Sequence, residues 1–284
     1  TPAVTVQCGE RLVTAQEGVY HLPYGEYEYV VKAKGYAKQT GRFTISAATE
    51  DPLTISVTLV QSASWDGAEQ EQPQGQGTQD PYEIESGAQL AWLAAFVNQS
   101  SSNADKAHAI LTQDIDLADN DWTPIGKSYS LQYKSSFDGQ GHSVDGLKVT
   151  ASEYAGLFGH ASSTTIQNVV VSGTVSSTSY TGGLLGQANG NVNIINCANT
   201  CNVTGTGYWT GGLVGRLNYQ SYGQSNTISG CYNTGTVTGG SASYSYYAGG
   251  IAGKDDTGCA ITDCYNTGDV TGYYAGGISG NGSS

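Results

Sequence analysis

The sequence predicts an all-β protein, with a small N-terminal β-sandwich followed by a parallel β-helix that begins with a short capping helix. The main observation is a Gly-Gly-hydrophobic-x-Gly motif that recurs in the second half of the chain. Its copies occupy residues 156–159 (shortened), 182–186, 211–215, 249–253 and 276–280. Their final glycines are 27, 29, 38 and 27 residues apart. Such a period is typical of a solenoid, whose units bury their apolar faces only by stacking on one another.

The composition also favours β-structure with many turns. Glycine accounts for 40 of the 284 residues, charged residues for 12%, and tyrosine (20) far outnumbers phenylalanine (4). The net charge of −13 argues against a nucleic-acid partner, because phosphate binding needs clustered Lys and Arg. No apolar run is long enough for membrane insertion. The chain starts at Thr1 and ends inside a repeat, so we expect a processed or cut fragment.

Residues 1–61 show the alternation of apolar and polar positions that is typical of strands. We expect strands at 4–6, 27–31, 42–45 and 53–59. The segment 25–36 resembles the small β-sandwich spacer modules of the PEGA or prealbumin-like (Ig-like) type, which implies a sandwich here. Residues 62–80 are rich in Gln, Gly and Glu, and are interpreted as a linker or an extended strap.

The β-helix is expected over residues 81–284, with its cap helix at about 86–98. Ser86 is a suitable N-cap, and Leu90, Leu93 and Val97 share one helical face. A solenoid has to cover its first strand edge, which otherwise invites aggregation. Residues 109–111, 115, 122–126 and 137–147 then form the irregular first coils.

A series of ordered segments connects this region to a known family. They are Trp-Asp-Gly at 65–67, Pro-Tyr-Glu-Ile at 81–84, Asp-Ile-Asp-Leu at 114–117, Trp-Thr-Pro-Ile-Gly at 122–126, Phe-Asp-Gly-Gln-Gly-His at 137–142 and Ala-Gly-Leu-Phe-Gly at 155–159. In these segments residues 64–284 resemble the GLUG-motif family of large exported bacterial proteins, which includes non-catalytic regions of some IgA-protease-like proteins. The resemblance implies a right-handed parallel β-helix at the cell surface, acting as a scaffold without catalytic residues.

Aligning the coils on the motif places equivalent residues in ladders. Three apolar ladders should point inward: Leu157, Leu184, Leu213, Ile251 and Ile278; Val175, Val203, Val237 and Val270; and Ile166, Ile194, Ile228 and Ile261. The glycines of the motif should permit a tight corner. Neighbouring coils would be about 4.8 Å apart. Asn199, Asn233 and Asn266 align as well, and their amides can bond along the axis of the stack.

Cysteines occupy a fourth ladder, formed by Val169, Cys197, Cys231 and Cys264. Buried cysteine behaves as a small hydrophobe, so we expect a reduced ladder. The alternative is a set of disulfides, although side chains that point the same way rarely reach the required torsion. Cys201 aligns with Gly173, Gly235 and Gly268, and the alignment does not explain it.

Aromatic residues two positions before each motif form the candidate binding site. They are Tyr154, Tyr180, Trp209, Tyr247 and Tyr274, preceded in three coils by Tyr208, Tyr246 and Tyr273. Stacked on neighbouring coils, the five would make a row about 20 Å long. The row either stabilises the corner or serves as a platform for sugar rings or a partner protein. The long third interval adds Tyr244 and a Gly/Ser-rich loop, a plausible place for binding.

Catalytic and metal-binding patterns are weak. Asp114, Asp116, Asp119 and Asp121 form the densest acidic cluster, but lack the spacing of an EF-hand; calcium near Asp114 and Asp116 is the alternative to solvated turn carboxylates. Asp255, Asp256, Asp263 and Asp269 form a second group, where Lys254 stands without a Lys or Arg ladder. The histidines at 21, 108, 142 and 160 are scattered. We therefore expect no enzyme, cofactor or metal.

The sequence thus predicts a non-catalytic adhesin or scaffold module on the bacterial cell surface, attached to the wall or secreted. It would be a monomer that presents a rigid β-helix to host glycan or protein. Two alternatives stay open: a β-helix polysaccharide lyase or glycosidase, and the spacer region of a larger surface protease. Release of reducing ends, abolished by changing Asp114 or Asp116, would identify an enzyme.

Overall fold

The computed structural model describes residues 3–8, 11–13, 20–33, 36–49, 52–58, 64–219, 224–242 and 246–281. The chain divides into two compact units, residues 1–63 and 64–284. Tyr244 and Leu59 lie outside the described residues. No helix in the described part of the chain is long and apolar enough to span a membrane.

The first unit contains one antiparallel sheet. Its strands are β1 (Ala3–Cys8), β2 (Arg11–Val13), β3 (Gly25–Ala33) and β4 (Tyr36–Ile45), in the order β2-β1-β3-β4. Tyr27 on β3 lies opposite Phe43 on β4, and the two rings stack with centroids 5.4 Å apart. Tyr27 is also buried and donates to Pro23 O at 2.8 Å. This cross-strand aromatic pair anchors the sheet.

The expected β-sandwich is wrong for the described residues, which form a single sheet. The strand expected at 53–59 is absent over 53–58, where Leu53 and Ile55 are 42% and 39% exposed. Alternating hydrophobicity gives a segment the period of a strand, but a strand also needs a partner edge and a covered face. Neither is present at 53–58.

The second unit begins with a strap and a capping helix. Residues 64–80, expected as a linker or a strap, belong to this unit. Trp65 N–H donates to Asp116 O at 3.0 Å, and the Trp65 ring packs edge-on against Trp122. The helix α1 (Gly87–Gln99) is capped by Ser86, whose side chain accepts from Gln89 N–H at 3.2 Å, as the sequence predicts. A short 3₁₀ turn, η1 (Ser101–Asn103), follows.

Two sheets of mainly parallel strands build the rest of this unit. The first contains β5 (Tyr82–Ile84), β6 (Ala109–Leu111), β8 (Phe137–Asp138), β10 (Phe158–Gln167), β12 (Leu185–Ile195), β16 (Val214–Asn218), β21 (Ala252–Asp255), β17 (Thr227–Ser229) and β22 (Ala260–Thr262). The second contains β7 (Ile115–Asp116), β9 (Ser143–Ala155), β11 (Val170–Gly182), β13 (Ala198–Asn199), β14 (Asn202–Gly205), β15 (Thr210–Gly211), β18 (Tyr232–Asn233), β19 (Val237–Thr238), β20 (Tyr247–Gly249), β23 (Tyr265–Asn266), β24 (Val270–Thr271) and β25 (Tyr274–Gly276).

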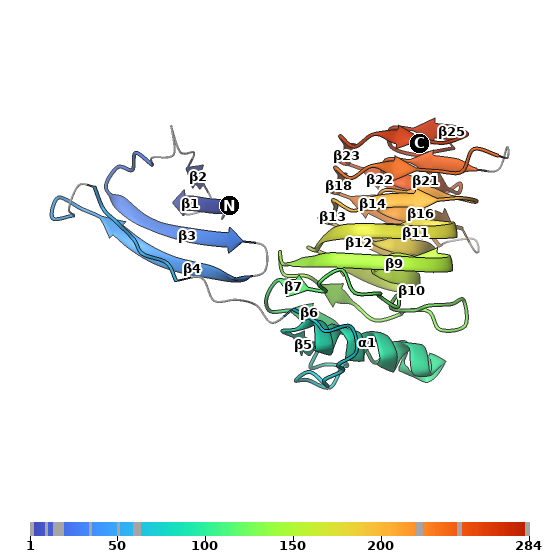
Figure 1. The fold of residues 1–284 in the computed structure, drawn as a ribbon, viewed down its shortest axis with the longest axis horizontal. Coiled ribbons are helices and arrows are strands. Elements are labelled where there is room, and N and C mark those ends of the chain that lie inside the picture. Colours follow the sequence, from blue (N-terminus) through green and yellow to red (C-terminus); the bar gives the residue numbers. More distant parts are fainter. Residues whose placement is uncertain are drawn as a thin grey trace. The chain divides into compact units, whose positions relative to one another are not determined.

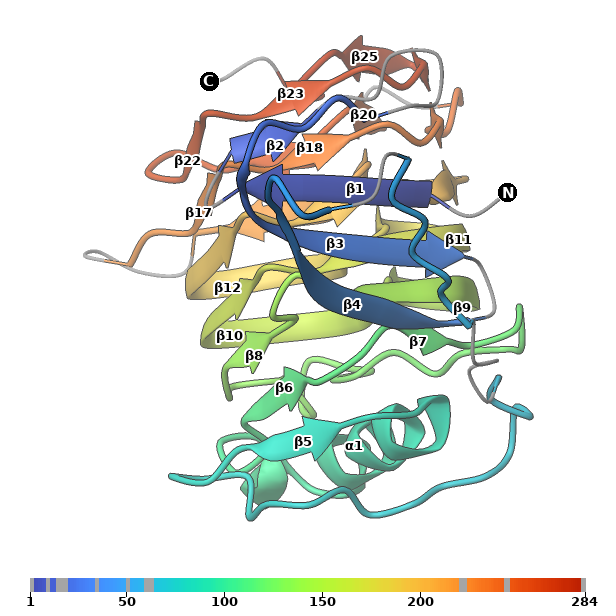
Figure 2. The same cartoon turned by 90° about the vertical axis from the view of Figure 1, so that its left-hand side faces the viewer.

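Strands of successive coils pair in parallel, so each coil lies on the one before it. Figure 1 shows these layers following one another from α1 to β25. In Figure 2, β5, β6, β8, β10 and β12 lie one above another on one face of the stack. The aligned valines and isoleucines pair as predicted, for example Val175 with Val203 and Ile194 with Ile228. The motif residues Leu157, Leu184, Leu213 and Ile251 are fully buried.

The glycines of the motif act through close approach rather than through left-handed turns. None of them has a positive φ. A Cβ on Gly212 would lie 2.5 Å from Cγ of Asn233, and one on Gly253 would lie 2.6 Å from Gly215 O on the preceding coil. The expectation that these glycines are needed for the backbone conformation of a tight corner is therefore wrong. They let the backbones of neighbouring coils meet and leave room for the asparagine ladder.

The asparagine ladder is confirmed, and its amides are linked along the stack. Asn199 Nδ2 donates to Asn233 Oδ1, and Asn233 Nδ2 donates to Asn266 Oδ1, both at 2.7 Å. Asn233 Nδ2 also donates to Gly235 O at 2.8 Å. Asn199 and Asn233 are fully buried. A chain of buried amides is strong when every member is satisfied and costly when one is missing.

Asn233→Ala should therefore lower the free energy of unfolding by about 2–3 kcal/mol, because it leaves buried partners unsatisfied on both neighbouring coils. Urea unfolding followed by tryptophan fluorescence checks this, since all four tryptophans lie in residues 64–284. Asn266→Ala, in the half-buried last rung, is the matched control and should cost about half as much. Equal losses of unfolding free energy in the two variants would contradict the greater importance of the buried central asparagine.

The cysteine ladder is buried. Val169, Cys197 and Cys231 are fully buried, Cys264 is half-buried, and the described cysteines of this unit are free thiols. Cys197 N–H donates to Cys231 Sγ at 3.2 Å. Cys201 is held by the asparagine ladder, because its N–H donates to Asn199 Oδ1 and its carbonyl accepts from Asn199 Nδ2, both at 3.1 Å.

These thiols should be unreactive in the folded protein. Hydrogen bonding to the Cys197 thiol raises the pKa of Cys231 to about 12, and burial raises the pKa of Cys201 well above its usual range. All three thiols of Cys197, Cys201 and Cys231 are fully buried, so a maleimide at pH 8 should leave them unlabelled until urea is added. Peptide mass spectrometry of the labelled protein locates the modification. Rapid native labelling of Cys197 or Cys231 would refute the buried ladder.

Candidate functional site

The eight predicted aromatic residues line one edge of the stack, which we call the aromatic edge. Their rings fall into two groups of contacts. Tyr154 stacks on Tyr180 (centroids 4.7 Å apart), and Tyr180 meets Trp209 edge-on at 4.9 Å. Tyr208 joins this group through Trp209 at 5.5 Å and extends it to Tyr246 at 5.3 Å.

The second group of the aromatic edge comprises the remaining three rings. Tyr247 stacks on Tyr274 at 5.3 Å, and Tyr273 meets Tyr274 edge-on at 5.0 Å. The structure gives no ring contact between Trp209 and Tyr247, both of which are described, so the continuous row of five that the alignment predicts is interrupted there. Tyr273 and Tyr274 are 40% and 42% exposed, and Tyr208 is 44% exposed.

Backbone conformation explains the interruption. Tyr154, Tyr180 and Trp209 have φ values of 55°, 55° and 53°, in the left-handed region. Tyr247 and Tyr274, the first residues of β20 and β25, do not have a positive φ. Side chains at one ladder position therefore leave the backbone in two different directions. A left-handed backbone is unusual for bulky residues, and such strain concentrates at functional sites.

A row of polar residues beside the first group was missed by the sequence reasoning. His160, Gln187, Arg216 and Lys254, which we call the polar row, occupy equivalent positions on β10, β12, β16 and β21. Each directly follows the last glycine of a motif, and this position is the signal that could have revealed the row. The interpretation of Lys254 as standing without a Lys or Arg ladder is therefore wrong. Arg216 lies beside it on the adjacent strand.

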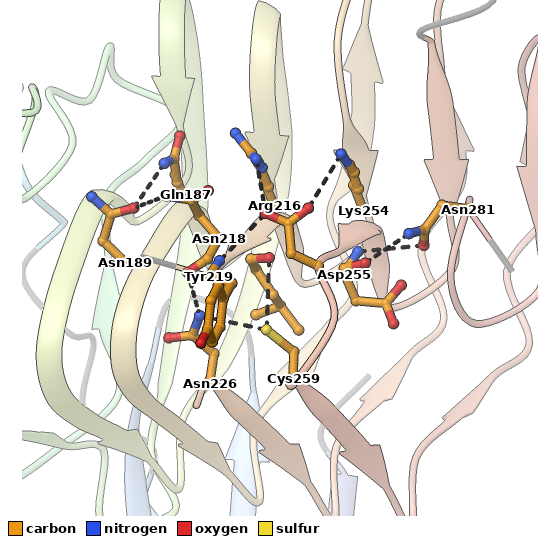
Figure 3. A network of polar contacts seen from close by, with 12 residues as sticks. Gln187, Asn189, Arg216, Asn218, Tyr219, Asn226, Lys254, Asp255, Cys259 and Asn281 are labelled. Atoms are coloured by element: carbon orange, nitrogen blue, oxygen red, sulfur yellow. Dashed lines mark hydrogen bonds and ion pairs between the residues drawn. The ribbon is translucent and has the colours of Figure 1, made fainter. Parts of the chain in front are cut away.

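The basic end of the polar row is an ion cluster around one carboxylate. Arg216 Nη2 lies 2.8 Å from Asp256 Oδ2, and Lys254 Nζ lies 3.2 Å from Asp256 Oδ1. Figure 3 shows Arg216 and Lys254 on neighbouring strands, with Gln187 and Asn189 on the next strand. Trp209 packs on both cations: its ring centroid is 4.3 Å from Arg216 Cζ and 5.5 Å from Lys254 Nζ. These cation–π contacts join the polar row to the aromatic edge.

Several buried polar atoms of this region have no hydrogen-bond partner within the described residues. They are both ring nitrogens of His160, Oε1 of Gln187, Nδ2 of Asn189, Nε1 of Trp209 and Nε of Arg216. His160 is fully buried and Gln187 is 5% exposed. Buried polar groups are normally satisfied, so a concentration of exceptions calls for an explanation. Burial lowers the pKa of His160 to about 4.

The acidic cluster at 114–121 is divided among separate partners. Asp114 Oδ1 accepts from Ser143 N–H at 3.0 Å and lies 3.1 Å from His142 Nδ1. Asp116 accepts from Ser64 Oγ, and Asp121 pairs with Lys148 at 2.9 Å. Within the described ranges, no three His, Cys, Asp or Glu residues are grouped as a metal site.

A shallow cleft of about 370 Å³ lies at the helical end of the unit, between the strap, α1 and residues 121–127. Trp65, Ala94, Asn98 and Trp122 are among the residues that line it. Both tryptophans are nearly buried, and their indole N–H groups donate to Glu69 O and Leu157 O. The rest of the lining is alanine together with polar and charged side chains, among them Gln70, Asp121 and Lys127.

Fold and site together define a protein of stacked parallel coils, with the helix α1 at one end and an aromatic edge. Residues 244–271 match the model of the GLUG motif, so the chain contains a GLUG motif. It is 36% identical over 218 residues to halomucin of Haloquadratum walsbyi, a match that covers 66% of this chain and 2% of halomucin. The chain thus spans only a small part of that relative.

One solved structure is similar in part. It is a crystal structure of a candidate immunoglobulin A1 protease from Bacteroides ovatus, with a TM-score of 0.46 and 18% sequence identity. The match covers 72% of this chain and 86% of that one.

Proposed function

We propose that this chain is a non-catalytic module on the cell surface, whose stacked coils form a right-handed parallel β-helix that binds a glycan or a protein. The GLUG motif and the parallel pairing of successive coils support the scaffold role. The binding role rests on one observation above all. Three successive coils hold an aromatic side chain on a left-handed backbone, and the rings lie beside a row of polar groups.

Sugar rings suit such a surface. Aromatic faces pack on the apolar faces of sugars, while neighbouring polar side chains bond the hydroxyl groups. Tyr154, Tyr180 and Trp209 supply aromatic surface, and the polar row supplies an unpartnered amide oxygen on Gln187 and the cationic donors of Arg216 and Lys254. The carboxylates of Asp114, Asp116 and Asp121 are engaged with other residues, which gives the hydrolase alternative no support from geometry.

A glycan array and pull-down experiments on the intact chain test the proposal. The wild-type chain should bind a glycan or a protein partner, and the affinity should fall at least tenfold in Tyr180→Ala. The matched control is Tyr265→Ala, because Tyr265 also stacks on a ring of the neighbouring coil (Tyr232, 5.1 Å) but lies outside the aromatic edge. Release of reducing ends or unsaturated products from a bound polysaccharide would identify the chain as an enzyme and contradict the proposed binding module. Equal losses in the two variants would remove the aromatic edge as the site.

A further inference from the structure

We infer that the ligand of this surface is an acidic polysaccharide, bound through its carboxylate or sulfate groups at Trp209, Arg216 and Lys254. This inference rests on the proposed function and names the chemistry of the ligand. The first support is the distribution of charge. Arg216 and Lys254 are the two basic residues of the sequence from 149 to 284, a stretch of several coils. The fold brings both to the same rung of adjacent strands.

Two like charges at directly paired positions destabilise a sheet unless an anion lies between them. Asp256 supplies one carboxylate, with one oxygen toward each cation. Two cations and one carboxylate leave one net positive charge. Asp255, the next residue, is buried and accepts a hydrogen bond from Ser279 Oγ on the last coil. The two cations that share the Asp256 carboxylate can therefore accept a further anion.

Donors for such an anion are present. Arg216 and Lys254 have side chains that are 20% and 28% exposed, so both heads reach the surface while remaining partly desolvated. Arg216 uses Nη2 for Asp256, which leaves other donors of its planar fork, and Lys254 has three N–H donors. A guanidinium matches the geometry of carboxylate and sulfate alike. Gln187, whose buried Oε1 is unpartnered, lies on the adjacent rung and can accept from a sugar hydroxyl.

The aromatic edge beside the cations indicates that the anionic group is a substituent of a sugar. Trp209 lies over both cations, and Tyr180 lies next to Trp209. A sugar ring that packs against the exposed parts of Tyr180 and Trp209 would therefore place its acidic substituent near Arg216. The overall charge of −13 opposes an anionic ligand only weakly. Charges farther away than the Debye length, about 8 Å at physiological salt, are largely screened.

Binding of the intact chain to immobilised polygalacturonate, dextran sulfate and neutral dextran tests the inference. Binding to one or both acidic polymers is expected, weakening at least tenfold between 50 mM and 500 mM NaCl, with no binding to dextran. The carboxylated and sulfated polymers distinguish the two possible acidic groups. Arg216→Gln/Lys254→Gln should weaken the binding at least tenfold and flatten its salt dependence. Lys254→Gln alone, on a partly exposed side chain, should give an intermediate loss if the double variant fails to fold.

The matched control is Lys134→Gln/Lys148→Gln, which removes the same charge from two exposed residues outside the site. If it lost as much affinity, net charge rather than the cluster would drive binding, and the inference would fail. Equal binding to dextran would also overturn the inference, yet leave the proposed glycan-binding function standing. Failure of all three polymers to bind the folded chain would count against both.

Discussion

Replacing Gly212 with alanine is expected to lower the free energy of unfolding of residues 64–284 by more than about 3 kcal/mol. The new Cβ would overlap Gly250 O and lie 2.5 Å from Cγ of Asn233. One obstacle is the backbone of the next coil, which cannot rotate away. The other is the centre of the buried asparagine ladder. Urea denaturation followed by tryptophan fluorescence measures the loss.

Gly277→Ala provides the control at the same motif position of the last described coil. A Cβ on Gly277 meets no atom within 4 Å, and its φ is not positive. This substitution should change the free energy of unfolding by less than about 1 kcal/mol in either direction. A similar loss at both glycines would mean that the motif acts through local backbone conformation, and would refute the role of contact between coils.

Acidification should destabilise the second unit through His160. This residue is fully buried between the rings of Tyr129 and Tyr154, and burial lowers its pKa to about 4 from an ordinary value of 6.5. The unfolded chain takes up a proton below about pH 6.5, whereas the folded chain does so only below about pH 4. Stability is therefore fully present above pH 6.5 and is lost as the pH falls toward 4, by roughly 3 kcal/mol in total.

His160→Gln isolates this contribution, since the equivalent residue of the next coil is Gln187. The difference in unfolding free energy between wild type and variant should fall by about 2–3 kcal/mol from pH 7.5 to pH 4.5. His21→Gln, at an exposed residue of the first unit, controls for the loss of one titratable group. A difference that does not change with pH would show that His160 is not held neutral.

Periodicity alone was enough to predict the stacking of the coils. One phase marker, the glycine motif, correctly aligned Val203 with Val237 and Asn199 with Asn233. Ladders are predictable because each coil repeats the environment of its neighbour. The structural reason for the glycines of the motif could not be predicted from the sequence. Only the three-dimensional register shows that Gly212 faces the Asn233 amide of the following coil.

The first unit was harder to predict because it has no repeat. Residues 53–58 alternate as regularly as β3, but alternation does not specify a partner, and only β3 finds one on each side. The polar row escaped notice for a different reason. His160, Gln187, Arg216 and Lys254 are chemically unlike one another, so their shared position after the motif is invisible to a search for repeated residue types.

Rings at the aligned positions are in contact, but the division of the aromatic edge into two groups was not foreseen. Trp209 and Tyr247 share a ladder position, yet only Trp209 has a left-handed backbone. Sequence alignment assigns position, whereas side-chain direction depends on backbone dihedrals. The Trp209 ring packs on Arg216 and Lys254. This contact between an aromatic ring and two cations supports an acidic ligand.

The most direct test is a crystal structure of the intact chain with oligosaccharide fragments of the acidic polymers. We predict density for a sugar packed on Tyr180 or Trp209, with its acidic group within about 3 Å of Arg216 or Lys254. A ligand found instead in the cleft between Trp65 and Trp122, with the aromatic edge unoccupied, would contradict the account.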